Sequence, residues 1–188
     1  MDGIIPKDKF NALSIRRPSH KEGHLVRGVW NIKCFDKNGK LKWEDKIENL
    51  VVNAGLDHIL DAVLAAGSQI TTWYVGITNT SPSPAAGDTM ASHGGWVENQ
   101  NYDEATRQTW TDGGVSSQSV DNSGSKATFT IDTNTQTIGG AFLTSDNTKG
   151  GSSGTLYAVG AFSGGDKSAD DDDTLQVTAT FTSADDGV

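Results

Sequence analysis

The 188-residue chain contains a single cysteine, Cys34, and this scarcity limits its covalent and metal chemistry. One cysteine cannot form an internal disulfide, and one thiolate alone cannot build a metal site. The residues around Cys34 alternate between apolar and polar side chains, as they do in a half-buried strand. We therefore expect Cys34 to be a buried, unreactive thiol inside a sheet.

Long apolar runs are also missing. No stretch approaches the roughly 20 apolar residues of a membrane-spanning helix, and residues 1–10 are too polar for a secretory signal. We therefore expect no membrane partner and synthesis in the cytoplasm of the host cell. Hydrophobic residues make up 35% and aromatic residues 7% of the chain, with Gly, Ser, Thr, Asn and Asp in excess. This composition favours many short strands joined by turns.

Positive charge is scarce except near the N-terminus. Residues 1–46 hold eleven Lys and Arg against six Asp and Glu, whereas residues 47–188 hold four against eighteen. The net charge of −9 argues against a dedicated, sequence-specific nucleic-acid binder. Two interpretations of the basic segment stay open: an arm that meets an acidic partner, or lysines gathered on one exposed hairpin near Lys37, Lys40 and Lys42.

Residues 1–25 lack a sustained period and contain Pro6 and Pro18, which disfavour a helix. We expect an extended basic arm that becomes ordered only against a partner. Its interspersed cations are the predicted partner-binding residues: Lys7, Lys9, Arg16, Arg17 and Lys21.

Residues 26–188 predict one β-rich body, since strand-like segments recur between Gly, Asn, Asp and Ser clusters. That spacing is typical of an antiparallel sandwich or barrel. The predicted strands are residues 29–35, 41–47, 70–78, 96–102, 108–111, 116–120, 126–132, 137–144, 155–162 and 174–182. The turn at residues 36–39 ends in Asn-Gly, which suits two adjacent residues at positive φ and predicts a hairpin.

One helix is predicted near residues 54–66, with Asn53 as its N-cap and Gly67 as its left-handed stop. Apolar residues recur at three- and four-residue spacing along it, which indicates one apolar stripe. The stripe consists of Leu56, Ile59, Leu60, Val63 and Leu64. We expect this stripe to be core and to cover the open end or face of a sheet.

Residue clusters that could carry chemistry each have a simpler structural explanation. His20 and His24 have a helical spacing, but Pro18 and Gly23 disfavour a helix there, so we predict no metal site. The run from Asp170 to Asp173 resembles a calcium ligand set, but adjacent side chains in an extended segment point in alternating directions. We therefore expect a solvated turn before the last strand.

Catalytic patterns are also weak. Glu98 and Glu104 could be imagined as a glycosidase pair, yet both suit the edges of neighbouring strands. No serine sits in a nucleophile elbow, and the glycine-rich segment 150–154 lacks the lysine of a phosphate-binding loop. We therefore expect no enzyme activity and no cofactor. The tryptophans and tyrosines alternate along strands, which indicates core packing, although a sugar-binding platform stays an alternative.

Several segments together resemble structural proteins of tailed bacteriophages and prophages. The residues that carry the resemblance are Asn49–Leu56, Trp73–Ile77, Ala86–Trp96, Tyr102 with Arg107, Asp121–Ser123, Gly139–Phe142 and Gly154–Ala158. The likeness covers roughly residues 26–182 and does not include the arm. It implies a virion component with a jelly-roll-like sandwich, of the kind found in capsid decoration (cement) proteins.

From this resemblance we expect a protein on the capsid exterior that binds the major capsid protein and stabilises the shell. We also expect a homo-oligomer, most simply a trimer, because viral lattices offer threefold sites. Two alternatives stay open: a tail or neck accessory protein that binds neighbouring tail proteins, and a carbohydrate-binding module on the virion surface.

Overall fold

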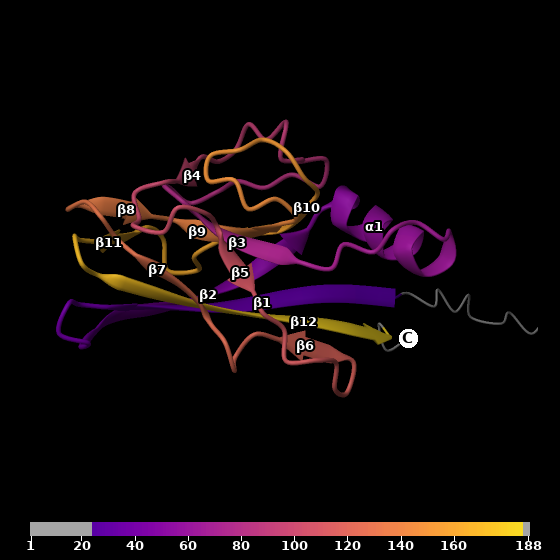
Figure 1. The fold of residues 1–188 in the computed structure, drawn as a ribbon, viewed down its shortest axis with the longest axis horizontal. Coiled ribbons are helices and arrows are strands. Elements are labelled where there is room, and N and C mark those ends of the chain that lie inside the picture. The colour runs from indigo at the N-terminus through magenta and orange to yellow at the C-terminus, as the bar shows by residue number, and fades with distance from the viewer. Residues whose placement is uncertain (1–23, 186–188) are drawn as a thin grey trace, which may run out of the picture.

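The computed structural model describes residues 24–185, which form a mostly β, antiparallel sandwich with one helix (Figure 1). The strands are β1 (His24–Phe35), β2 (Leu41–Val51), β3 (Trp73–Thr78), β4 (Glu98–Asn99), β5 (Gln108–Trp110), β6 (Ser119–Asp121), β7 (Ala127–Thr130), β8 (Gln136–Ile138), β9 (Gly140–Thr144), β10 (Leu156–Ala161), β11 (Lys167–Ala169) and β12 (Thr174–Asp185). The helix α1 (Asn53–Leu64) follows β2 directly. The predicted fold class is therefore confirmed for the body.

Two layers share strand β2. The first part of β2 pairs with β1, and β1 pairs along its whole length with β12. The other edge of β12 pairs with β6 and β7. The last residues of β2, Leu50 and Val51, pair instead with β10, which continues through β9 and β3 to β4 and β5. β2 thus crosses from one layer to the other, and its end delivers the chain into α1.

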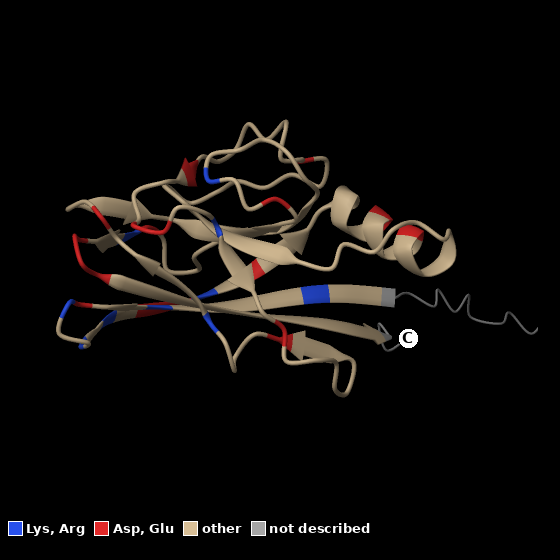
Figure 2. Ribbon diagram, viewed as in Figure 1, with Lys and Arg blue, Asp and Glu red and all other residues tan. Residues whose placement is uncertain are grey.

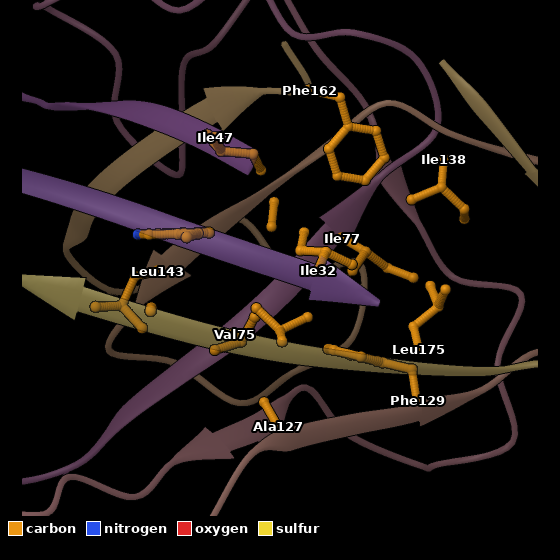
Figure 3. Close-up of a cluster of buried hydrophobic side chains, with 14 of the residues drawn as sticks. Ile32, Ile47, Val75, Ile77, Ala127, Phe129, Ile138, Leu143, Phe162 and Leu175 are labelled. Atoms are coloured by element: carbon orange, nitrogen blue, oxygen red, sulfur yellow. The ribbon is translucent and has the colours of Figure 1, made fainter. Parts of the chain in front are cut away.

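The main core lies between the two layers (Figure 3). Strand alternation produces it, because every second side chain points to the same face. One layer contributes residues such as Ile32, Ile47 and Leu175, and the other contributes Val75 and Leu143. β9 is buried along its whole length, since its second face packs under the loop that carries Met90 and Trp96.

Each predicted strand overlaps an observed strand, but the predicted strand 96–102 is only the two residues of β4, and 116–120 overlaps β6 only at residues 119 and 120. Two further differences concern the number of strands. The predicted strand 137–144 is two strands, because the chain breaks at Gly139, where a Cβ would overlap the backbone of Thr80. β11, which pairs with β8, was not predicted, because its sequence Lys-Ser-Ala has no strand-like period.

The predicted hairpin between β1 and β2 is confirmed, but its turn chemistry is different. Asn38 does not adopt a positive φ, and only Gly39 does, at 80°. The Asp36 carboxylate accepts hydrogen bonds from the amides of Asn38 and Lys40. The turn is therefore held by Asp36 as well as by Gly39.

Cys34 lies in β1 with its side chain fully buried, as predicted. Its thiol contacts the carboxylate of Asp173 at 3.9 Å. Burial, and then the negative charge of Asp173, raises the pKa of Cys34 to about 12. Both effects disfavour the thiolate, which is the reactive form.

Candidate interaction surface

Helix α1 approaches the sheet through its glycine. Gly55 is the buried residue of α1, and a Cβ there would lie 2.5 Å from the backbone oxygen of Tyr157 in β10. Only glycine allows two backbones to come this close. The contact therefore fixes which side of α1 faces the sandwich.

The ends of α1 differ from the prediction. Val52 is the N-cap, in extended conformation and without a side-chain cap, while Asn53 is the first helical residue. The residue with left-handed backbone is Ala66, with φ of 58°, and not Gly67. The amide of Gly67 instead donates to the Asp61 carbonyl at 2.9 Å, so the chain closes the helix one residue earlier than expected.

The apolar stripe of α1 does not form core, which corrects the prediction. Leu56, Leu60, Val63 and Leu64 are 39%, 56%, 74% and 78% exposed, and Ile59 is half-buried. Gly55, Ile59 and Ala62 form the inward side of the helix, so the leucines point away from the sheet. We call Leu56, Leu60, Val63 and Leu64 the leucine stripe.

Beside the leucine stripe lie two adjoining hollows of about 370 and 380 Å³, which we call the end groove. Both are lined by Ile59, Val120, Tyr157 and Phe181. The first hollow also reaches Trp73 and Trp110, and the second reaches Val26 and Val115. Val26 is the first residue of β1 to line the groove. β1 begins at the same end of the sandwich as α1 (Figure 1).

The aromatic rings around the groove support one another edge to face. Trp73 meets Tyr157 at 5.3 Å between ring centres, and Tyr157 meets Phe181 at 5.1 Å. The indole Nε1 of Trp110 donates to the Ala179 carbonyl at 3.2 Å. These rings are packed into the end of the core, as the alternation along the strands predicted.

Glu98 and Glu104, the two carboxylates considered as a glycosidase pair, each have a separate structural role. Glu98 is buried and accepts two hydrogen bonds from Arg107, one at 2.9 Å from Nε and one at 2.7 Å from Nη2. Arg107 also donates to the carbonyls of Asp146 and Gly151. Glu104 instead accepts the amide of Thr130 in β7. Both carboxylates are therefore structural, but only Glu98 lies in a strand as expected, since Glu104 lies in the bend before β5.

The aspartate run forms the expected turn, but it is not simply solvated. Asp173 is buried, and Lys42 of β2 bonds to its carboxylate and, at 3.0 Å, to that of Asp170. The hydrogen bond from Lys42 to Asp170, followed by that from the Thr135 amide, lowers the pKa of Asp170. Asp172 adopts a positive φ of 66°. Within residues 24–185, no three His, Cys, Asp or Glu side chains gather in a metal-binding arrangement.

Charge is distributed unevenly between the two ends of the sandwich (Figure 2). Lys37 and Lys40 are exposed on the β1–β2 hairpin, far from α1, so the hairpin interpretation holds for part of the basic segment. At the other end, α1 exposes Asp57 and Asp61 beside the leucine stripe. The predicted partner-binding residues, Lys7, Lys9, Arg16, Arg17 and Lys21, lie outside the described residues, and their role stays a prediction.

Sequence reasoning found the leucine stripe but missed the end groove. The groove joins residues from β1, α1, β6, β10 and β12, whose proximity no local pattern reveals. Gly55 was the available sequence signal for the side of α1 that packs on the sheet, because a glycine inside a helix often marks close packing.

Comparison with known proteins finds no match: no family model, curated protein or solved structure is similar to this chain at a significant level. Among residues 24–185, no helix has the length and apolar character needed to cross a membrane.

Proposed function

We propose that this protein is a non-catalytic structural component of a tailed-phage particle that binds the capsid exterior and stabilises the shell. The leucine stripe is the observation that carries the proposal. Four large apolar side chains on one helix face are exposed together, and such contiguous apolar surface marks interaction sites. The sequence resemblance to phage structural proteins supports the particle as the partner.

The stripe is presented on a firm support, which suits a cement protein. Gly55 holds α1 against the backbone of β10, and β10 lies inside a sheet buried on both faces. A rigid surface loses little conformational freedom when it binds, so more of the contact energy remains for attachment. Repeated contacts around a lattice then add through avidity, without a strong single site.

Two ion pairs of the body support the same role, because they link separate segments. The pair of Arg107 and Glu98 ties β4 to the loops around Asp146 and Gly151. The pair of Lys42 and Asp173 ties β2 to the turn before β12. Both arrangements use their charges to hold the chain together.

The test measures binding of the purified full-length protein to purified capsids that lack it, by co-sedimentation. Replacing Leu60 and Leu64 with Glu removes the stripe and should lower capsid occupancy at least tenfold. Val97 is the matched control, because it is 61% exposed in a loop away from α1. Val97→Glu should bind normally. Normal binding by the L60E/L64E variant would reject the stripe as the capsid contact.

Copy number on intact particles separates the head assignment from the tail or neck alternative. A decoration protein should be present in on the order of hundreds of copies, whereas tail and neck rings hold about three to twelve. The carbohydrate-binding alternative has less support, since Trp73 and Tyr157 pack edge to face and present no flat stacking platform. Specific binding on a glycan array would favour it.

A further inference from the structure

The end groove and the leucine stripe meet at Val63, which belongs to the stripe and also lines the first hollow. Leu56, Leu60 and Leu64 line neither hollow, so most of the stripe lies outside the groove. Ile59, Tyr157 and Phe181 are shared by both hollows of the groove, so it is continuous. Its lining is mostly apolar and suits a few apolar side chains from an extended segment.

The start of β1 brings one candidate segment directly to the groove. Val26 lines the groove, and the described chain begins two residues before it, at His24. The nearest cluster of apolar residues before β1 is Phe10, Leu13 and Ile15. Eight residues separate Ile15 from His24, and an extended stretch of that length reaches about 26 Å. The segment can therefore fold back into the groove of its own chain.

Short tethering favours the chain's own segment over a second copy, because a short flexible linker produces an effective concentration on the order of millimolar. A separate copy at micromolar concentration competes poorly with that.

We propose that Phe10, Leu13 and Ile15 occupy the end groove of the same chain. The arm then covers the apolar end of the core. This gives the arm a partner within its own chain, which departs from the expectation that it becomes ordered only against another protein.

Disulfide trapping in the free, full-length protein tests this arrangement. Ser14→Cys leaves the three apolar residues intact, and Gln69→Cys places a thiol on an exposed groove-lining residue. Under mild oxidation, the S14C/Q69C variant should form an intramolecular disulfide. Cys34 is buried and should not compete.

The matched control is S14C/R27C. Arg27 is exposed and nearer to the arm along the chain, but it neighbours Val26 in β1 and so points to the opposite face. The groove pair should cross-link at least tenfold faster than this control. Replacing Phe10, Leu13 and Ile15 with Ser in the S14C/Q69C background should abolish the advantage.

Three outcomes would overturn the proposal. Equal rates for the two pairs, or an advantage that survives the serine replacements, would mean that tethering alone brings the thiols together. Covalent dimers in place of intramolecular bonds would assign the groove to a second copy. Since the experiment uses free protein, its result does not depend on whether the protein binds capsids.

Discussion

Single residues inside this sandwich carry charges that would be costly to bury alone. The Arg107 side chain is fully buried and makes a two-point contact with Glu98, whereas Lys33 and Glu44 form an ion pair of 3.0 Å on the surface. Removing one partner of a buried pair leaves an uncompensated charge, while a surface pair is already well solvated. The two pairs should therefore respond very differently to the same substitution.

Arg107→Met should lower the free energy of unfolding by about 3–5 kcal/mol, because Glu98 then lacks its partner. Lys33→Met, the surface control, should change the free energy of unfolding by less than about 1 kcal/mol. Urea denaturation followed by tryptophan fluorescence measures both. The double variant E98M/R107M should recover part of the loss, and a double variant no more stable than R107M would argue against an uncompensated charge.

Cys34 is a second residue whose surroundings decide its chemistry. With the pKa of Cys34 raised to about 12, the thiol should stay protonated at pH 9 and should not react with a disulfide reagent in the folded protein. It should react fully in urea. An exposed thiol introduced by Asn38→Cys provides the positive control. Rapid labelling of Cys34 in the folded protein would show that this part of β1 opens readily.

At the scale of elements, the rotation of α1 determines which surface the molecule offers. Its apolar stripe has the spacing of a core-facing helix, but Gly55 is the residue that touches the sheet. The helix turns its smallest residue inward because the backbone of Tyr157 lies too close for a side chain. The leucines are consequently exposed on the outer side of α1, where a partner could bind them.

Gly55→Ala tests this contact through the sign of its effect. In an open helix the change to alanine stabilises by about 1 kcal/mol. Here the added methyl would collide with the Tyr157 backbone, and we expect a loss of about 1–3 kcal/mol in urea denaturation. The control is Ala66→Gly, which relieves a positive φ and should stabilise by about 1 kcal/mol. A stabilising G55A variant would mean that α1 is not held in this position.

The leucine stripe makes a separate prediction about stability. Leu60→Ala should lower the free energy of unfolding by less than about 0.5 kcal/mol, because Leu60 is exposed. Leu143→Ala in β9 should cost about 2–5 kcal/mol, because that side chain is buried between the layers. Thermal and urea denaturation of both variants would compare them. A similar cost at both positions would show that the stripe is covered in solution.

At the scale of the whole molecule, we expect three copies to associate around a threefold axis when attached to the particle. The contact we expect is segment 111–134, which carries few charges and contains both β6, at the end of its sheet, and the exposed Val115. Sheet edges of this kind are commonly covered by a partner. Closed symmetry lets identical patches meet identical lattice sites.

Native mass spectrometry of protein released from particles should detect the trimer, and particle images processed without imposed symmetry should place three copies in contact. A lone copy at a site without rotational symmetry would contradict the trimer. Images that locate the protein on the tail would instead support the alternative that it is a tail or neck accessory protein.

Much of the body was predictable from the sequence, because the relevant signals are local. Alternation along residues 29–35 predicted both β1 and the burial of Cys34, and the Asn-Gly turn predicted the hairpin to β2. These features depend on neighbours within a few residues, where side-chain direction and turn preference act directly. The fold class followed from the repetition of such segments.

The tertiary structure decided the surfaces and the buried contacts. A stripe of leucines shows that one helix face is apolar, but not whether this chain covers it, since that depends on the distant backbone of Tyr157. The burial of Asp173 likewise depends on Lys42, which is far away in the sequence. Such pairings arise only when long loops close, and a local pattern contains no information about which segments meet. For this reason the sequence alone determined the strands and the hairpin, while packing determined the ion pairs, the end groove and the exposed side of α1.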